Sequence, residues 1–519
     1  MQKILLSGAA AVLLAANAAA DYSNTVMSFS PLGYWQLNET IAAPADMATN
    51  SGTLGASGHG YYVSGATHPG SGALAVGTSQ AVTFPDLAGN RVVVPYKPAL
   101  ATTAPFSVEF WANPANTSGG DGATMCVASL TQFGNPPGAG DGTRKGWLFY
   151  QNGGTGWIFR TYGTGNTAFN ATANTGVTPG NWYHIVGVYD GTSTIIYVNG
   201  QMIASTPATS FVPADTNAAP LSVGARGYGS LGFFRYNGSV DEMVYYTNVL
   251  SAGEILSHYQ NGTNTAPATP YATLIQAKSP AVYLRFEEPS YSAPDPSTYP
   301  VAVNKGSLIL DADGHYLPGS MPGSAGVTYT GVATPNYATS FGPERGGWVD
   351  VGTSESLNFT GPFTISTWFK TAPTDTRFQS FIGKGDSSWR AGIDSDGKAR
   401  FAFGSNSDAT GTANLNDGKW HQLVGVYDGA NLLLYIDGVL DVTQPAPNAV
   451  SGNANSALIG TVPDYGDGRV FKGSMDEVRS VWCRHYRLCR FSSSFFLPMF
   501  RRASSNNRPV RLVRAKVLA

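Results

Sequence analysis

One stretch of 20 residues constrains this chain most, because it occurs twice. The first copy runs from Asn181 to Gly200 and the second from Lys419 to Gly438, and 9 of the 20 aligned positions are identical. Each copy alternates apolar runs with Asp-Gly or Asn-Gly pairs. Such pairs favour tight turns between antiparallel strands, because the turn residues adopt positive φ. The stretch therefore predicts a three-stranded β meander in each of two repeats.

The repeats extend well beyond the meander. The segment Ser30–Glu39 matches Ser279–Glu288, which lies 249 residues later, and both predict an opening strand followed by an acidic turn. The alternating strand Phe106–Trp111 has its counterpart in Phe363–Trp368. We therefore expect each opening segment to begin its own repeat.

These matches divide the chain into domains. We expect a first β-sandwich over residues 21–262, a Pro/Thr linker over 263–272 and a second β-sandwich over 273–480. Charged residues make up only 12% of the chain and glycine is abundant, which fits many short strands joined by turns. Ser251 and Glu254 form a capping-box pattern that predicts one helix after the last strand of the first repeat.

The N-terminus has the pattern of a signal peptide over residues 1–20. Lys3 precedes an apolar run, and small residues precede Asp21. The run is too short to span a bilayer comfortably, and no later apolar run approaches 18 residues. We therefore expect an exported protein, secreted or at the cell surface, with no transmembrane segment after cleavage.

The C-terminus breaks the repeat pattern. Residues 481–519 contain eight Arg and one Lys but no acidic residue. We interpret them as a basic tail, unstructured or produced by a frame shift after Arg479. A basic arm for anionic polymers or membranes is one alternative. A metal site from Cys483, His485 and Cys489 is another, although this spacing matches no usual zinc pattern.

The ordered set of motifs resembles one family. The set comprises an opening Tyr…Glu strand, Phe-x4-Trp, Trp-x4-Gly-Val-Tyr-Asp-Gly, Tyr-x-[Asn/Asp]-Gly and Gly-Ser-x-Asp-Glu, and it occurs over about residues 30–265 and 275–480. It resembles the LamG-like jelly-roll domains of the concanavalin A-like lectin/glucanase superfamily. The resemblance implies an all-β fold of two tandem antiparallel jelly-roll β-sandwiches. Members are often modules of surface, glycan-associated or adhesive proteins, but function varies within the fold.

The sequence argues against an enzyme. Retaining glucanases of this fold group carry a Glu-x-Asp-x-x-Glu strand, and no Glu-x-Asp occurs here. Asp241-Glu242 and Glu287-Glu288 are adjacent pairs, whose side chains point to opposite faces of a strand. His184 has no histidine counterpart in the second repeat, and we interpret it as a surface or boundary residue.

Two pairs of residues are the candidate sites. Asp241 and Asp476 occupy matching positions and could each bind Ca²⁺, because related lectin-like domains use carboxylates at a sheet edge; the alternative is that each caps backbone N–H groups. Tyr228 and Trp389 lie in loops that differ between the repeats. They are candidate aromatic platforms for a sugar, and packing at a sheet edge is the alternative. The shared Trp111 and its counterpart are expected in the core.

We therefore expect a non-enzymatic binding or adhesion protein that recognises an extracellular glycan or a surface protein through sandwich loops. Structural spacer domains of a larger envelope protein are the alternative, and a glycoside hydrolase is less favoured. Outside its tail the chain is mildly acidic, so we expect no nucleic-acid partner. The sequence leaves open the ligand, the calcium, the oligomeric state, the natural C-terminus and any pairing of Cys126.

Overall fold

The computed structural model describes residues 22–482, with gaps at residues 64, 88–89, 119–123, 134–142, 215–218, 228–233, 329–331, 333, 343–344, 373–376, 405–406 and 447–449. The expected signal peptide, Tyr228, Cys483 and Cys489 lie outside the described residues. Cys126 is a buried free thiol.

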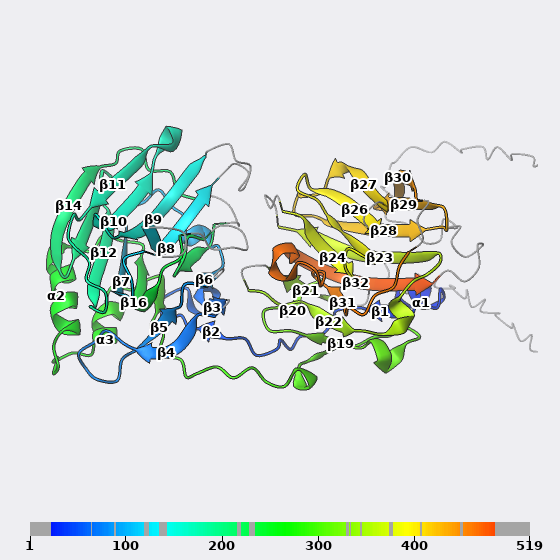
Figure 1. The fold of residues 1–519 in the computed structure, drawn as a ribbon, viewed down its shortest axis with the longest axis horizontal. Coiled ribbons are helices and arrows are strands. Elements are labelled where there is room, and N and C mark those ends of the chain that lie inside the picture. Colours follow the sequence, from blue (N-terminus) through cyan, green and yellow to red (C-terminus); the bar gives the residue numbers. More distant parts are fainter. Residues whose placement is uncertain are drawn as a thin grey trace, which may run out of the picture.

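In the described part of the chain, four eight-stranded sheets form two β-sandwiches that lie side by side (Figure 1). We call them sandwich one and sandwich two, and in each we distinguish a back sheet from a front sheet. The predicted all-β architecture of two tandem antiparallel sandwiches is confirmed.

The back sheet of sandwich one contains β4 (Thr67–Ser71), β5 (Gln80–Phe84), β7 (Phe106–Pro114), β12 (Tyr183–Tyr189), β13 (Ser193–Val198), β14 (Gln201–Pro207), β16 (Gly238–Tyr246) and β17 (Val282–Leu284). Their order is β14-β13-β12-β7-β16-β5-β4, and β17 also pairs with β16. The front sheet contains β2 (Met47–Ala48), β3 (Gly60–Val63), β6 (Arg91–Val94), β8 (Thr124–Phe133), β9 (Arg144–Asn152), β10 (Gly156–Tyr162), β11 (Ala168–Thr172) and β15 (Leu221–Val223). Its order is β11-β10-β9-β8-β15-β6-β3-β2.

Sandwich two repeats this plan strand for strand. Its back sheet contains β1 (Gly33–Trp35), β20 (Met321–Ala325), β21 (Tyr337–Phe341), β23 (Phe363–Thr371), β28 (Trp420–Tyr427), β29 (Asn431–Ile436), β30 (Val439–Pro445) and β32 (Gly473–Trp482). Its front sheet contains β18 (Val301–Ala302), β19 (Gly314–Tyr316), β22 (Val349–Gly352), β24 (Gln379–Gly383), β25 (Trp389–Ile393), β26 (Lys398–Phe403), β27 (Ser407–Asn414) and β31 (Ala457–Ile459). The orders are β20-β21-β32-β23-β28-β29-β30, with β1 on β32, and β18-β19-β22-β31-β24-β25-β26-β27.

The helices of the described residues are few and short. The α-helices are α1 (Tyr22–Met27), α2 (Ala252–Gly262) and α3 (Tyr271–Gln276). The 3₁₀ turns are η1 (Gly55–Gly58), η2 (Pro98–Leu100), η3 (Thr164–Asn166), η4 (Pro296–Thr298), η5 (Ile309–Ala312), η6 (Glu355–Leu357) and η7 (Gly466–Arg469). Helix α2 has the predicted capping box between Ser251 and Glu254. Within the described residues, no helix is long and apolar enough to cross a membrane.

The duplicated stretch forms the predicted meander in both sandwiches, as β12-β13-β14 and β28-β29-β30. Asn199 and Gly200 both adopt positive φ at the second turn, as predicted. At the first turn only Gly191 does, so that part of the prediction is wrong; Asp190 instead accepts hydrogen bonds from the backbone of the turn. The shared Gly187 is required by packing, because a Cβ there would lie 2.4 Å from the ring of Phe149.

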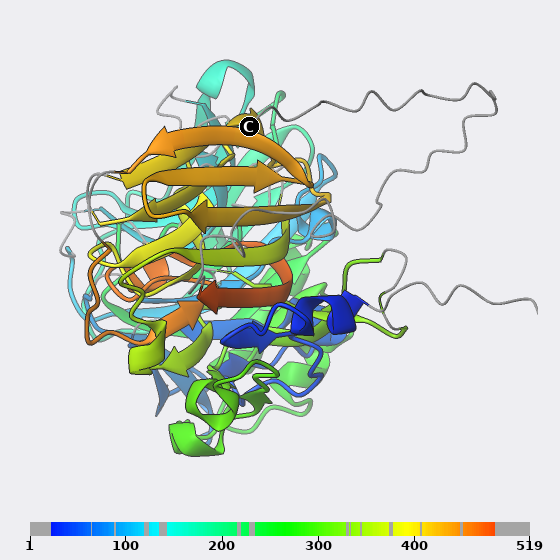
Figure 2. The same cartoon turned by 90° about the vertical axis from the view of Figure 1, so that its right-hand side faces the viewer.

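The predicted domain boundaries differ from the structure at the opening segments. Strand β1 pairs with β32 of sandwich two, although residues 21–262 precede that sandwich in the chain. Strand β17, expected to open the second repeat, pairs with β16 of sandwich one. Figure 2 shows the blue N-terminal segment beside the orange β32. The two opening segments are therefore exchanged between the sandwiches.

Each sandwich has an apolar core between its sheets and a second apolar layer on the outer face of its back sheet. In sandwich one, α2 and α3 cover that outer face and bury Trp111, Ile255 and Tyr271. In sandwich two, α1 covers the equivalent face and buries Tyr22 and Trp368. Trp111 and Trp368 are therefore core residues, as predicted, whereas Trp182 and Trp420, which are also shared and were expected in the core, are only partly buried.

Candidate functional site

The aromatic candidate Trp389 is a core residue and cannot offer a ring to a sugar. It is the first residue of β25, its side chain is 0% exposed, and its ring packs on Phe359. Its Nε1 donates to the carbonyl oxygen of Leu357 at 2.8 Å. The expectation from sequence is wrong because the preceding loop ends at Ser388, so that Trp389 follows the inward alternation of the strand.

Asp241 and Asp476 lie at the same place in the two sandwiches, inside a β-bulge of β16 and of β32. Asp241 accepts hydrogen bonds from the backbone N of Ala73 at 2.8 Å and from Oγ of Ser79 at 2.7 Å. Asp476 accepts from the backbone N of Val327 at 2.9 Å. The capping interpretation therefore describes one oxygen of each carboxyl group.

The other oxygen of each group is buried without a hydrogen-bond partner in the described part of the chain; these atoms are Oδ1 of Asp241 and Oδ1 of Asp476. Burial, reinforced by the charge of Glu477, raises the pKa of Asp476 to about 8. Burial and the charge of Glu242 raise the pKa of Asp241 well above its usual value. A nearby cation would therefore stabilise the charged form of both carboxyl groups.

The donor set for Ca²⁺ is partly present. Calcium takes six to eight oxygen ligands, and Asp241 and Asp476 each offer one buried oxygen that has no other partner. Between residues 22 and 482, leaving out the gaps, no group of three or more His, Cys, Asp or Glu is placed to hold a metal ion. A calcium ion at either position would therefore need backbone carbonyls for most of its ligands.

A second carboxylate cluster was not predicted. Glu109 on β7 is fully buried and accepts hydrogen bonds from Nε2 of His184 at 2.8 Å and from Nδ1 of His258 at 3.0 Å. Tyr246 and Tyr271 each donate a hydroxyl to it at 3.0 Å. His184 is thus buried, and its prediction as a surface or boundary residue is wrong.

The Glu109 cluster is an ion-paired network sealed beneath α2 and α3. Burial alone would raise the pKa of Glu109, but the charge of His258 and hydrogen bonds from both histidines hold that pKa well below its usual value. In turn, burial would lower the pKa of His258, and the charge of Glu109 raises it. In sandwich two, β23 carries Ser366 at the equivalent place, so the network is a feature of sandwich one alone among the described residues.

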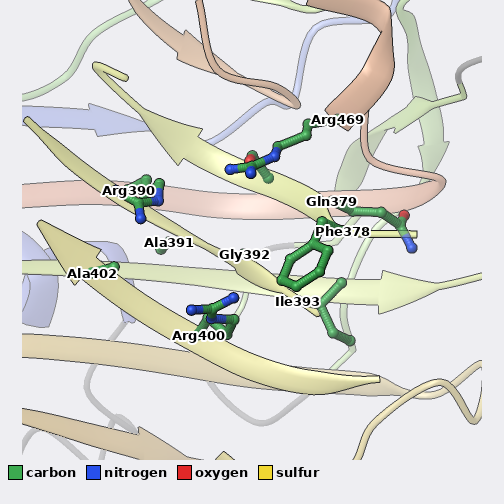
Figure 3. Close-up of a pocket in the computed structure, with 10 residues that line it drawn as sticks. Phe378, Gln379, Arg390, Ala391, Gly392, Ile393, Arg400, Ala402 and Arg469 are labelled. Atoms are coloured by element: carbon green, nitrogen blue, oxygen red, sulfur yellow. The ribbon is translucent and has the colours of Figure 1, made fainter. Parts of the chain in front are cut away.

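The front sheet of sandwich two is hollowed at β24–β26 by a small pit, which we call the arginine pit (Figure 3). It has a volume of about 50 Å³. Its lining residues are Phe378, Gln379, Ser380, Arg390, Ala391, Gly392, Ile393, Arg400, Ala402 and Arg469. Among the described residues, the lining thus holds three guanidinium groups, an aromatic ring and no carboxylate.

The guanidinium groups of the pit are held by acidic residues outside its lining. Asp386 accepts from Arg390 and from Arg469 at 3.2 Å each, and Asp408 accepts from Nε of Arg400 at 3.0 Å. Burial lowers the pKa of Arg400, and the charge of Arg390 lowers it further. An anionic group in the pit would relieve this repulsion.

A larger hollow, which we call the aspartate cleft, lies at the β18–β22 end of the same sheet. Its volume is about 620 Å³. Its lining residues are Pro296, Ser297, Tyr299, Asp311, Asp313, His315, Leu317, Pro318, Asp350, Val351, Gly352, Thr353 and Ser456. It therefore combines carboxylates and an imidazole with apolar and aromatic surface.

The pit and the cleft share the outer face of one sheet. Val349 and Ile459 are paired core residues, so Asp350, next to Val349, faces outward together with its partner His315. Gly392 and Arg400 are also directly paired and lie away from the core. The sequence signal for the pit was the hairpin spacing of Arg390 and Arg400 about the Asp396-Gly397 turn, which places both on one face.

A family model described as the concanavalin A-like lectin/glucanases superfamily matches residues 76–256 and 343–484, together more than half of the chain. The two matches correspond to the two sandwiches. No curated protein matches the chain.

Several solved structures are similar to the chain. Domains LG4-5 of the mouse laminin alpha1 chain are 14% identical, with 81% of this chain and 91% of that chain covered and a TM-score of 0.25. The CBM40 of Ruminococcus gnavus IT-sialidase bound to alpha2,3 sialyllactose is 14% identical, with 34% and 95% covered and a TM-score of 0.29. Domain 4 of AbnA, an extracellular arabinanase from Geobacillus stearothermophilus, in complex with arabinotriose, is 21% identical, with 28% and 71% covered and a TM-score of 0.24.

Proposed function

We propose that this chain, which belongs to the concanavalin A-like lectin/glucanases superfamily, is an exported, non-catalytic module that binds an extracellular glycan on the front sheet of sandwich two. The aspartate cleft carries this proposal. Its volume of about 620 Å³ lies within the usual range for small-molecule sites, about 300–1,000 Å³. Carboxylates such as Asp350 can accept hydrogen bonds from sugar hydroxyls.

The arginine pit supports a glycan with an acidic group. At about 50 Å³ the pit lies far below the usual range for small-molecule sites, about 300–1,000 Å³, and is too small for a sugar ring. A carboxylate or a sulfate fits this size, and guanidinium groups bind such anions with paired hydrogen bonds. Phe378, which is 41% exposed at the rim, adds apolar surface for the adjoining sugar beside the guanidinium groups of Arg400 and Arg469.

A binding role without catalysis is supported by the acidic pairs at the bulges. A glycosidase needs two carboxyl groups on either side of one glycosidic bond. Asp241 and Glu242 are buried and bind different partners, since Glu242 accepts from Tyr283 and Arg285. The superfamily also contains domains that bind proteins, so a surface protein is the second candidate ligand.

Replacing Arg400 with Ala should weaken the binding of a carboxylated oligosaccharide by about 10- to 100-fold, because a hydrogen bond to a charged group contributes about 1.5–3 kcal/mol. The same substitution should have little effect on the affinity for the oligosaccharide whose carboxyl groups have been reduced to alcohols. A glycan array on the intact chain identifies the ligand, and titration calorimetry measures the change.

The matched control is Arg160→Ala, because Arg160 lies at the equivalent hairpin of sandwich one and should leave binding unchanged. Equal affinity of wild type for the carboxylated and the reduced oligosaccharide would contradict the acidic-group assignment. Absence of binding to every glycan on the array would favour a spacer role for the chain, or a protein ligand. Cleavage of a bound glycan would contradict a non-catalytic role.

We also propose that Asp241 and Asp476 each contribute to a calcium site. The support is the repeated geometry, in which the same carboxyl oxygen is buried and unpartnered in both sandwiches. A Ca²⁺ ion bound there would stabilise the charged form of each carboxyl group, which burial alone disfavours.

Calcium should raise the melting temperature of the wild-type chain. At 100 times its dissociation constant, a ligand stabilises the native state by about 2.7 kcal/mol, and each kcal/mol raises the melting temperature of a domain of this size by about 2–4 °C. The double variant D241N/D476N should show no calcium-dependent shift in differential scanning calorimetry, whereas D311N should keep the shift of the wild type. Absence of a shift in the wild type would remove the ion from both sites.

A further inference from the structure

Two segments of this chain are structural equivalents. Residues 22–39 and residues 271–288 each form a short helix followed by a short strand and an acidic residue. Tyr22 and Tyr271 accept hydrogen bonds from the shared core tryptophans, Trp368 at 3.2 Å and Trp111 at 3.0 Å. We call each of them a closing segment, because each completes the back sheet of one sandwich.

The N-terminal closing segment is deeply embedded in sandwich two. Tyr34 and Trp35 are 0% exposed. The backbone N of Tyr34 donates to Oδ1 of Asn304 at 2.8 Å, and Nε1 of Trp35 donates to the carbonyl oxygen of Ala312 at 2.8 Å. We call the surface that receives this segment the closing slot.

The far end of the segment is held as firmly as its strand. Glu39 accepts from the backbone N of Val303 at 3.1 Å and from the hydroxyl of Tyr316 at 2.7 Å. Tyr34 also donates its hydroxyl to the buried Glu477. All of these partners belong to sandwich two, so none of these contacts depends on how the segment is joined to sandwich one.

The order of the chain explains why the segments are exchanged. The segment 271–288 follows α2 and stays on sandwich one, so sandwich one is closed by the segment that comes after it. The prediction that residues 263–272 link the two sandwiches is therefore wrong. Sandwich two is closed by residues 22–39, which come before sandwich one. Figure 1 shows the two resulting connections between the sandwiches, in blue and in green, formed by residues 40–46 and 289–300.

We propose that residues 22–39 are a transferable closing segment, and that the closing slot of sandwich two accepts this segment from a second copy of the chain. Within one chain, residues 40–46 must reach from sandwich two to sandwich one, and seven extended residues span at most about 25 Å. When that connection is long enough, the high effective concentration of a linked segment favours closure within the chain. When it is too short, the same contacts can form only between copies.

The first test shortens the connection. The full chain lacking residues 41–44 should form a dimer in light scattering after size-exclusion chromatography, while the amides of β32 keep the protection of the wild type in hydrogen exchange. A matched variant in which the same four residues are replaced by Gly-Ser-Gly-Ser should remain monomeric. A shortened chain that stays monomeric, whether sandwich two is protected or unprotected, would overturn exchange between copies.

The second test supplies the segment in trans. A synthetic peptide of residues 22–39 should bind the chain that starts at residue 40 and restore protection of β32, as measured by fluorescence anisotropy and hydrogen exchange. The peptide with Tyr34→Ala and Trp35→Ala should bind at least 100-fold more weakly, because both side chains are fully buried in the slot. Equal binding of the two peptides, or no binding by either to an acceptor that calorimetry shows to be folded, would overturn the closing slot. If the chain that starts at residue 40 does not fold, the dimer test on the full chain decides.

Discussion

Replacing Glu109 with Gln is expected to destabilise sandwich one by about 3–5 kcal/mol, because removing one partner of a buried charged pair leaves the other uncompensated. The variant keeps the shape of the side chain but loses the charge that His184, His258 and two tyrosine hydroxyls surround. The melting temperature of sandwich one should fall by about 6–20 °C in calorimetry. The control His421→Gln removes partly exposed pairs with Asp417 and Asp437 and should cost no more than about 1 kcal/mol.

The difference between wild type and the Glu109→Gln variant should depend on pH with a maximum. The pKa of Glu109 is lowered from its ordinary value of 4.5, so its stabilisation is present above pH 4.5 and is lost as the pH falls. The pKa of His258 is raised from 6.5, so its stabilisation is present below pH 6.5 and is lost as the pH rises through the raised pKa. The difference should therefore be largest between pH 4.5 and 6.5. A difference that is constant from pH 4 to 9 would contradict the ion pair.

Much of the fold could be predicted from the sequence because the local signals agree with the global structure. The meander turns, the capping box and the alternating strands each depend on residues close together in the chain. The strand exchange could not be predicted, because Ser30–Glu39 and Ser279–Glu288 have the same pattern and would fit either sandwich. Only the lengths of the connections and the packing of whole sandwiches decide which slot each segment occupies.

The candidate sites were harder to predict for a different physical reason. Trp389 stands after a polar loop, and a shift of one residue in strand alternation decides whether its ring faces solvent or the core. The Glu109 cluster brings together residues from β7, β12, β16, α2 and α3 that are up to 162 positions apart. One signal of this cluster is present in the sequence. Glu109 and His184 lie in apolar strands, and neither has the same residue at its aligned position in the second repeat. Asp241 and Asp476 could be chosen as candidates from the sequence because matching positions in two repeats can be recognised without knowledge of long-range packing.

The variants Trp389→Ala and Arg390→Ala distinguish the contribution of the core of sandwich two to stability from the contribution of its proposed binding face to affinity. The two residues are neighbours on β25, but Trp389 is buried and Arg390 lines the arginine pit. Trp389→Ala should destabilise sandwich two by about 3–5 kcal/mol, since a large buried ring is lost and a cavity remains. Arg390→Ala should cost about 1 kcal/mol or less, because its ion pair with Asp386 is partly exposed.

Binding should show the opposite ranking. Measured at low temperature, where both variants are folded, the affinity for the carboxylated oligosaccharide should be kept by Trp389→Ala and reduced about tenfold or more by Arg390→Ala. Denaturant unfolding and calorimetric titration on the same samples provide the two readouts. A Trp389→Ala variant with native stability and no binding would indicate that Trp389 contacts the ligand, and would contradict its assignment to the core. The arrangement seen here, with adjacent side chains on opposite faces of one strand, requires instead that stability and binding be lost separately.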